Sequence, residues 1–205
     1  MRIAPPFLML VTEPCERLGS IVGEAIAGGV NLVQLRDKAS STTSLLPTIA
    51  RLRALTAPAG ARLVVNGDWT ILRESDADGV QLPEGDPSLR RARAGIPSEL
   101  VLGASVHSIE AARRAVDDGA DYLVAGTIFP SRSHPERRPG GLRFLEAVCE
   151  AVRPSPVLAI GGVTSERARS CTDAGAAGVA VLSAIMHSAD PRAAAAAFMK
   201  ELSHD

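Results

Sequence analysis

Short apolar runs recur along the whole chain, and they constrain its fold more than any other feature. Most of these runs lack the alternation of apolar and polar residues that marks a half-exposed strand, so they predict strands buried on both faces, as in a parallel sheet. The runs are Phe7–Val11, Val30–Leu35, Arg62–Val65, Gly79–Leu82, Leu100–Ala104, Tyr122–Ala125, Pro156–Ile160 and Val179–Leu182.

Segments with helical periodicity lie between the runs. The segment at 108–118 begins with Ser108 as a cap and Glu110 in its first turn, and it stops at Gly119. The others are Leu18–Ala27, Thr43–Leu55, Leu142–Val152 and Ser165–Ala174. Strands and helices therefore alternate along the chain, which is consistent with a closed barrel and also with an open doubly wound sheet.

A joint between helix and strand recurs and favours the barrel. Each copy ends a helix on glycine or other small residues and enters a strand at once: GGVNLVQL, SDADGVQL, DDGADYLVAG and DAGAAGVAVL. Repeated joints of this kind indicate a repeated βα unit. We therefore predict one domain over residues 1–205, an α/β chain folded as a (β/α)8 TIM barrel with its functional residues after the strands.

Composition excludes several classes of function. The chain has 22 basic and 23 acidic residues, so it has no basic surface for nucleic acid or for anionic membranes. No apolar run approaches the roughly 18 residues of a membrane span. The three cysteines, Cys15, Cys149 and Cys171, are far apart and odd in number, which favours buried thiols in a reducing, cytoplasmic compartment.

Two loops at the end of the chain predict a phosphate site. Gly161 and Gly162 follow the seventh strand, while Leu182 ends the eighth and Ser183 follows it. Ser183 is predicted to start the last helix, and Ser165 to cap the one before. Glycine permits close approach of the backbone, and the first amides of a helix bind anions. A plain tight turn would also explain one Gly-Gly pair, but barrels usually hold phosphate at these two loops.

Polar side chains follow the other strands. Gln34, Arg36 and Lys38 alternate at the end of the second strand, so all three are expected to point into the barrel mouth. The two cations are expected to bind an anion there, although solvated surface charge would also explain them. Further substrate-binding candidates after strands three, five and six are Asn66, Ser105, Thr127, Ser131 and Ser133.

Two histidines are candidates for proton transfer, because imidazole titrates near neutral pH. His134 lies in the loop 130–141, which is polar and rich in proline and glycine and resembles a lid in composition. A solvated loop histidine would have the same pattern. His107 lies at a junction of strand and helix, and this position is consistent equally with a structural hydrogen bond and with a catalytic role.

These loops together resemble the thiamine phosphate synthase family, which includes the synthases proper and the TenI-type thiazole tautomerases. The resemblance covers nearly the whole chain and implies a (β/α)8 barrel. The pieces that carry it, in family order and spacing, are QLRDK, VNGD, DADGVQLPEGD, GASVHS, GADYLVAGTIFPSRS, AIGGV and GVAVLSAI.

The resemblance implies different chemistry for the two branches. Synthases join an aminopyrimidine diphosphate to a thiazole phosphate with Mg²⁺ held by two aspartates; here the first is Gly67 and the second is Asp86. The diphosphate lysine is replaced by His134, and a histidine after the fourth strand by Gln81. Tautomerases share the Asn-Gly, GVQLP and SVHS segments, although some have a histidine where this chain has Thr127.

The sequence therefore favours an aromatising thiazole tautomerase, an isomerase that acts on carboxythiazole ethyl phosphate without a cofactor. His134 is then the expected proton carrier, with His107 in reserve, while Arg36 and Lys38 pair with the ring carboxylate. One alternative is thiamine phosphate synthase, a transferase with Mg²⁺ on Asp86. Another is a non-catalytic regulator that binds thiazole phosphate. The expected partner is the small phosphorylated thiazole substrate. The sequence is also compatible with a homodimer.

Overall fold

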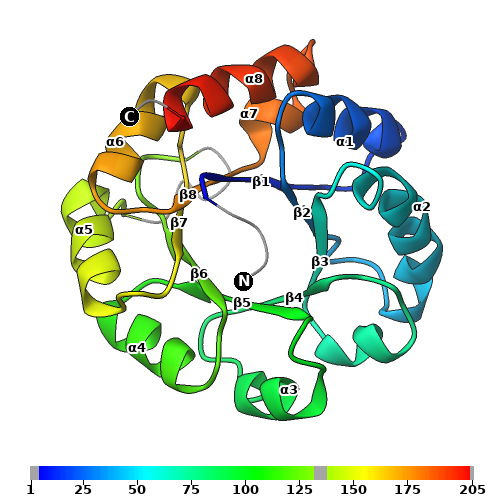
Figure 1. Cartoon of the computed structure of the whole chain (residues 1–205), viewed down its shortest axis with the longest axis horizontal. Coiled ribbons are helices and arrows are strands. Elements are labelled where there is room, and N and C mark those ends of the chain that lie inside the picture. The colour runs from blue at the N-terminus through cyan, green and yellow to red at the C-terminus, as the bar shows by residue number, and fades with distance from the viewer. Residues whose placement is uncertain (1–4, 132–137, 204–205) are drawn as a thin grey trace.

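The computed structural model describes residues 5–131 and 138–203 and has eight parallel strands in a closed barrel (Figure 1). The first and last strands close it, with Phe7 paired to Gly178 and Leu10 to Val181. The predicted (β/α)8 barrel is confirmed. The strands are β1 (Phe7–Val11), β2 (Leu32–Leu35), β3 (Arg62–Asn66), β4 (Gly79–Leu82), β5 (Val101–Val106), β6 (Tyr122–Gly126), β7 (Val157–Ile160) and β8 (Gly178–Val181).

Helices surround the barrel in Figure 1, and in the part of the chain that is described none is long and apolar enough to cross a membrane. They are α1 (Leu18–Ala27), the 3-10 helix η1 (Thr43–Leu45), α2 (Leu46–Thr56), the 3-10 helix η2 (Trp69–Arg73), α3 (Leu89–Gly95), α4 (Ile109–Asp117), α5 (Gly141–Ala151), α6 (Ser165–Asp173), α7 (Ser183–Met186) and α8 (Pro191–Leu202).

Two of the helical predictions need correction. The segment predicted as one helix at 43–55 is η1 followed by α2, with Pro47 in the first turn of α2. Proline has no N–H to donate and is tolerated only at the start of an α-helix, so α2 begins there. Ser183 does not begin the last helix: it begins α7, and α8 follows at Pro191, where Asp190 caps the amide of Ala193.

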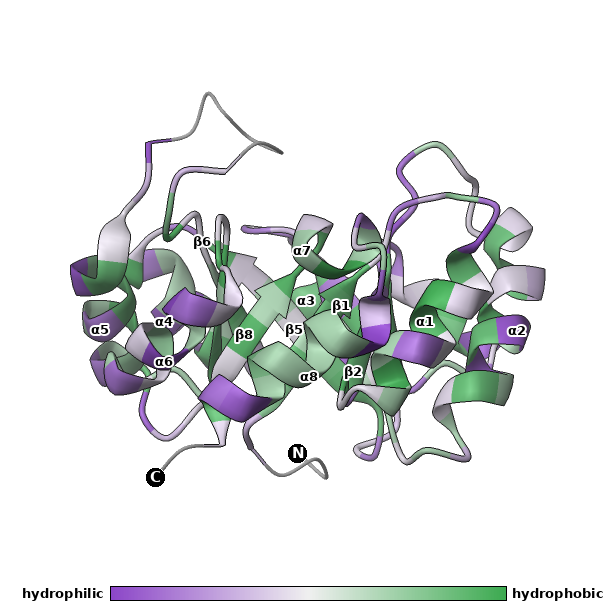
Figure 2. Ribbon diagram, turned by 90° about the horizontal axis from the view of Figure 1, so that it is seen from above, coloured by the Kyte–Doolittle hydropathy of each residue, from purple (hydrophilic) through white to green (hydrophobic). Residues whose placement is uncertain are grey.

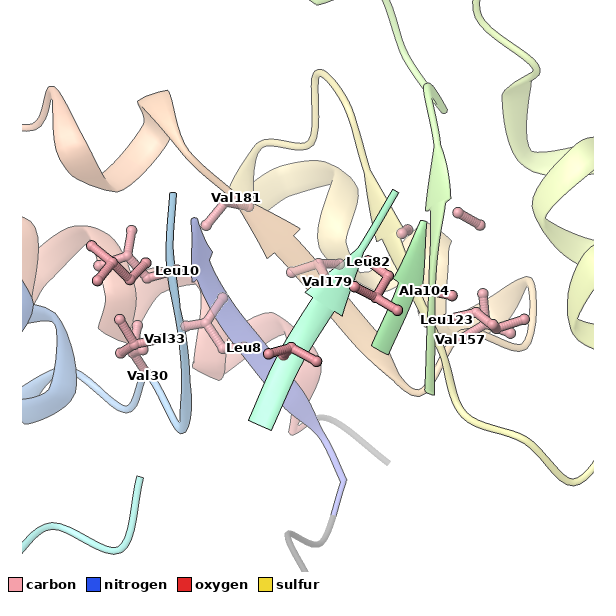
Figure 3. Close-up of a cluster of buried hydrophobic side chains, with 14 of the residues drawn as sticks. Leu8, Leu10, Val30, Val33, Leu82, Ala104, Leu123, Val157, Val179 and Val181 are labelled. Atoms are coloured by element: carbon pink, nitrogen blue, oxygen red, sulfur yellow. The ribbon is translucent and has the colours of Figure 1, made fainter. Parts of the chain in front are cut away.

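Both faces of every strand are buried, which is why the strands lack alternation in sequence. Along β1, Phe7, Met9 and Val11 belong to a cluster inside the barrel, while Leu8 and Leu10 belong to a second cluster under the helices. Figure 3 shows part of the second cluster, and Figure 2 shows hydrophobic residues on the sides of the helices that face the barrel.

The recurring joint has a physical cause at the lower rim of the barrel. In three of its four copies, a polar residue just before an even-numbered strand accepts a hydrogen bond from the backbone of the preceding strand. These bonds are Leu8 N to Asn31 Oδ1 at 3.1 Å, Leu63 N to Asp78 Oδ2 at 2.8 Å and Leu102 N to Asp121 Oδ2 at 2.7 Å. The fourth copy has Ala177 at this place.

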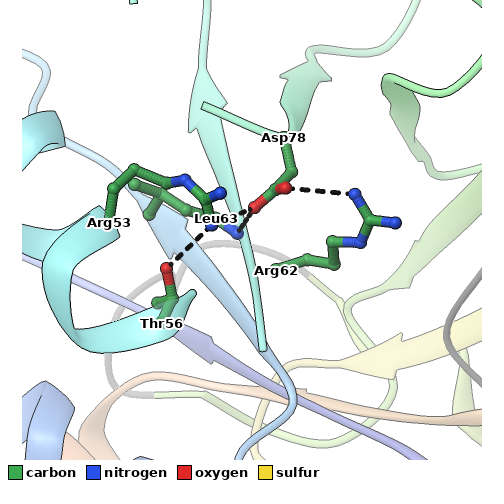
Figure 4. A network of polar contacts seen from close by, with 5 residues as sticks. All are labelled: Arg53, Thr56, Arg62, Leu63 and Asp78. Carbon is green, nitrogen blue, oxygen red and sulfur yellow. Dashed lines mark hydrogen bonds and ion pairs between the residues drawn. The ribbon is translucent and has the colours of Figure 1, made fainter. Parts of the chain in front are cut away.

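Asp78 is the centre of the largest of these arrangements (Figure 4). Its carboxylate pairs with Arg53 Nη1 at 2.8 Å and with Arg62 Nη1 at 3.0 Å, and it also accepts the amide of Leu63. The Asp78 side chain is 11% exposed, so these partners compensate a carboxylate that has lost most of its hydration. Asp78 thereby ties β3 to β4 and to α2.

The cysteines depart partly from the prediction. Cys149 and Cys171 are buried, and burial raises the pKa of each thiol to about 11. Cys15, in the segment after β1, is exposed. The prediction of buried thiols is therefore wrong for Cys15.

We expect Asp78→Ala to lower the free energy of unfolding by about 3 kcal/mol, because it leaves two partly buried arginines and a strand amide without their acceptor. Urea denaturation measures this loss. Asp118→Ala is the matched control, since Asp118 pairs with Arg90 at 2.6 Å but the arginine side chain is 77% exposed. That change should cost less than about 1 kcal/mol. Equal losses in the two variants would contradict the role given to Asp78.

Candidate functional site

Polar side chains gather near the carboxyl ends of the strands, at the mouth of the barrel. Alternation along the strands places Gln34, Asn66, Gln81 and Ser105 on the inner side. Gln81 Nε2 donates to Ser105 Oγ at 3.1 Å, which links β4 to β5 just below the mouth. The structure therefore brings these side chains from four different strands to one end of the barrel.

The prediction that Gln34, Arg36 and Lys38 all point into the mouth is only partly correct. Gln34 is buried inside the barrel, with its Nε2 at 3.8 Å from Met9 Sδ. The strand ends at Leu35, so the alternation does not continue to Lys38, which is exposed in the following turn. Arg36 is partly buried, and its amide donates to Thr12 Oγ1 at 3.2 Å, which holds the start of this turn against the end of β1.

Asp37 shapes the turn between the two cations. Its Oδ2 accepts from the Ser40 hydroxyl at 2.6 Å, and its Oδ1 accepts from the amide of Ala39 at 2.9 Å. These hydrogen bonds, above all that from Ser40, lower the pKa of the Asp37 carboxyl. Asp37 is thus a structural residue of the turn that presents Arg36 and Lys38.

The Gly161–Gly162 pair forms a tight turn between β7 and α6. Both residues have positive φ, 96° and 62°. A Cβ at Gly162 would collide with the carbonyl oxygen of Pro130, and a Cβ at Gly161 would come within 2.5 Å of Thr127 Cγ2. The β6–α5 loop therefore packs on this turn and requires both glycines, in addition to the anion-binding geometry that the sequence predicts.

Helix α6 begins differently from the prediction. Thr164 occupies the N-cap position, with φ −109° and ψ 168°, and Ser165 is the first helical residue. The capping role predicted for Ser165 is therefore wrong by one residue. The first turn of α6 lies next to the glycine turn, and a helix N-terminus favours an anion. The Glu166 carboxylate already lies at this helix end, where hydrogen bonds from the Thr164 side chain and from its own amide lower its pKa.

The turn after β8 lies beside the glycine turn because β7 and β8 are neighbours in the barrel. Leu182 packs on the interior cluster, and Ser183 is exposed at the start of α7. Thr127 and Ser131 come from the β6–α5 loop; both are partly buried. Ser133 and His134 lie outside the described residues, so their predicted roles stay predictions.

A cavity of about 620 Å³ opens at the carboxyl ends of β4, β5 and β6. It contains one predicted catalytic residue, His107, and one predicted binding residue, Thr127. The residues that line it are Pro83, Glu84, His107, Gly126, Thr127, Arg138, Gly140 and Phe144. The cavity therefore lies between the loops that follow β4, β5 and β6.

Glu84 holds His107 at the wall of this cavity. Its Oε1 accepts from the His107 amide at 3.0 Å, and its Oε2 lies 2.7 Å from His107 Nδ1. A carboxylate on one ring nitrogen fixes the orientation and tautomer of an imidazole. Sequence reasoning missed Glu84, and the available signal was that QLPEGD and SVHS follow strands adjacent in the barrel.

Two buried polar atoms under the mouth, Gln81 Oε1 and Tyr122 Oη, have no hydrogen-bond partner among the described residues. Gly103 lies against both, and a Cβ there would collide with each. Burial raises the pKa of Tyr122, so this hydroxyl stays protonated and can act as a donor. The resemblance implies a histidine at the position of Gln81. Here the side chain of Gln81 lies against the uncharged residues Ser105 and Gly103.

The acidic residues near the mouth could bind Mg²⁺ only together with oxygen atoms of a bound substrate. No cluster of three metal-binding side chains occurs among the residues described. Asp86 is partly buried after β4, with Oδ1 accepting the amide of Ser88 at 2.8 Å. Gly67 has φ 114°, which disfavours an aspartate there, and exposed Asp68 caps η2. One carboxylate together with diphosphate oxygens is a common magnesium site, so Asp86 would hold the ion.

We expect Gly162→Ala to weaken binding of inorganic phosphate by more than about tenfold, because the added methyl group must displace Pro130 and the turn. Isothermal titration calorimetry measures the affinity. Gly60→Ala is the matched control: Gly60 has a similar φ of 70°, but open space surrounds the point where a Cβ would stand. That variant should lose about 1–2 kcal/mol of stability and keep its phosphate affinity. Unchanged affinity in Gly162→Ala would refute the assignment of the turn.

Known proteins with related sequences agree with this architecture. A thiamine-phosphate synthase of Gloeobacter violaceus is 38% identical over 201 residues, which are 98% of this chain but 59% of that protein. One from Geobacillus thermodenitrificans is 38% identical over 96% of this chain and 90% of its own length. The chain thus spans less than two thirds of the first relative and nearly all of the second.

A solved structure extends the similarity to three dimensions. Thiamine phosphate pyrophosphorylase from Pyrococcus furiosus superimposes with a TM-score of 0.85 at 36% identity, covering 96% of this chain and 95% of that one. The family model described as thiamine monophosphate synthase matches residues 8–185, from β1 to α7. The relatives carry the name of the synthase and not of the tautomerase, so this chain belongs to the thiamine monophosphate synthase family.

Proposed function

We propose that this protein is a thiamine phosphate synthase, a transferase that joins an aminopyrimidine methyl diphosphate to a thiazole phosphate. The observation that carries the proposal is the glycine turn after β7 beside the serine turn after β8, in a chain whose relatives over almost its whole length are named for this activity. This reverses the preference that the sequence gives to the tautomerase.

The mouth divides into two anion-binding sides under this proposal. Gly161, Gly162 and Ser183 bind the phosphate of the thiazole, and Arg36 and Lys38 bind the diphosphate of the pyrimidine. β1 lies between the two sides, since β8 and β2 both pair with it. The reacting rings then meet above the centre of the barrel, over Gln34 and Ser105.

The reaction needs charge stabilisation more than proton transfer. The thiazole nitrogen uses its own lone pair to form the new C–N bond, while the C–O bond to the diphosphate breaks and its electrons leave with the diphosphate. Arg36 and Lys38 would stabilise that departing charge, with Arg36 suited to bidentate contacts. Mg²⁺ bound at Asp86 would supply further neutralisation of the diphosphate.

A pair of variants tests this division. Arg36→Met should raise KM for the pyrimidine diphosphate and lower kcat, each by about 10–100-fold, and leave KM for thiazole phosphate unchanged. Ser183→Ala should raise KM for thiazole phosphate only, by about tenfold. Steady-state formation of thiamine phosphate with Mg²⁺ measures both. A wild-type chain that forms no thiamine phosphate under these conditions would overturn the proposed function.

Thiazole tautomerase is the second candidate, and the Glu84–His107 pair favours it. The pair lines the cavity, and its carboxylate–imidazole contact is the arrangement of a general acid–base group. A tautomerase needs such a group to move a proton between ring carbon and alkene carbon, whereas the transfer reaction does not. His134, the first choice on sequence, would share or take this role.

We expect His107→Asn and Glu84→Gln to leave thiamine phosphate formation within about threefold of wild type, because neither group is required to move a proton in the transfer. If the chain is a tautomerase, His107→Asn should instead lower the rate of thiazole aromatisation by about 10²–10⁴-fold. Ultraviolet absorbance of the aromatic ring measures that rate. Binding of thiazole phosphate without either activity would identify the non-catalytic regulator.

The cytoplasmic location and the homodimer stay predictions.

A further inference from the structure

One arginine contacts both of the loops that meet at the phosphate turn. Arg167 is the third residue of α6, and its Nη1 donates to the carbonyl oxygen of Gly162 at 2.9 Å. The same guanidinium lies over the ring of Phe129, 4.9 Å from its centroid. Gly162 belongs to the loop after β7 and Phe129 to the loop after β6, so a single exposed side chain joins the two.

Among the described residues, backbone hydrogen bonds hold these loops together only as far as Gly161. Ile128 N donates to Ile160 O and Phe129 N to Gly161 O, both at 2.9 Å. Beyond them the turn is held by packing, since Gly162 lies against the carbonyls of Phe129 and Pro130. The contact from Arg167 therefore fixes the next peptide group of the turn, the one between Gly162 and Val163.

Fixing the carbonyl of a peptide group also fixes the amide that follows it. A trans peptide is planar, and its C=O and N–H point in opposite directions. Because Arg167 holds the Gly162 oxygen, the Val163 N–H is directed to the other side of the turn. That amide comes immediately before α6, where the N–H groups favour an anion. The guanidinium also brings a permanent positive charge to the turn, and part of this charge acts on the neighbouring Glu166 carboxylate.

We propose that Arg167 is a positioning residue for the phosphate group of the substrate. It orients the Gly162–Val163 peptide, holds the turn against Phe129 and adds positive charge beside it, which suits a phosphomonoester dianion. The identity of that phosphomonoester as thiazole phosphate rests on the proposed function. The role of Arg167 toward the anion itself does not depend on turnover.

Calorimetry on the full chain tests this role, with inorganic phosphate and thiazole phosphate as the probes. Arg167→Met should weaken both by about tenfold, because it removes the hydrogen bond and the charge while it keeps the length of the side chain. Arg169→Met is the matched control: Arg169 is exposed on the same helix, two residues further on. It should change each affinity by less than about twofold.

Two further variants distinguish the positioning role of Arg167 from a general effect of its positive charge on phosphate binding. Arg167→Lys keeps the cation and should recover part of the lost affinity, but less than all, because lysine lacks the planar group that stacks on Phe129. Phe129→Leu should weaken phosphate binding in the same direction as Arg167→Met. The double variant should lose less than the product of the two single losses, because both changes remove one shared contact.

The kinetic readout distinguishes this proposal from the proposed function. In thiamine phosphate formation, Arg167→Met should raise KM for thiazole phosphate about tenfold and leave kcat and KM for the pyrimidine diphosphate unchanged. If the wild type forms no thiamine phosphate but Arg167→Met still weakens phosphate binding, the function is wrong and the role of Arg167 stands. If Arg167→Met binds both probes as tightly as the wild type, the role of Arg167 is wrong.

Discussion

Burial of both faces of one closed parallel sheet is the constraint on which the rest of this structure depends. The interior of the barrel is filled by side chains such as Phe7, Met9 and Leu158, and the outer face is covered by the helices. Polar groups are therefore confined to the two rims, apart from a few satisfied or uncharged ones such as Gln81. Closure by β1 and β8 also decides which loops are neighbours.

The two rims use their polar residues for different purposes. At the lower rim, Asp78 and Asp121 accept strand amides and arginines, and the contacts hold adjacent strands in register. At the upper rim, the Arg36 amide donates to Thr12, and Ser105 accepts from Gln81, beside Asn66 at the end of β3. This division matches the rule that stability resides at the amino ends of barrel strands and function at the carboxyl ends.

The glycine turn after β7 shows how a proposed binding feature and a packing feature coincide. Its glycines are required because the β6–α5 loop leaves no room for a Cβ, and the same close packing brings Thr127 and Phe129 against the turn. At Gly67 packing is not the reason for glycine, because a Cβ there would meet open space. The reason is the backbone conformation, which has a positive φ of 114°. If the synthases have a magnesium aspartate at this position, as the resemblance implies, glycine changes the conformation of the loop as well as its charge.

Much of the fold was predictable because its strongest signals are local. The doubly buried strands, the repeated joints and the glycine stops depend on residues next to one another in the chain, and the loops after β7 and β8 could be placed for the same reason. Helix boundaries were less predictable near Pro47 and Pro191, where the missing amide decides where an α-helix can begin.

The sequence alone determined the barrel and which polar residues, such as Gln34 and Ser105, come at the carboxyl ends of its strands. Tertiary structure decided which of those residues meet. The contact of Glu84 with His107 spans 23 positions, and Arg167 reaches Phe129 across a strand. Such contacts depend on strand order and on the packing of one loop against another, and no periodicity in the chain encodes either, because side chains distant in sequence become neighbours only when the sheet closes.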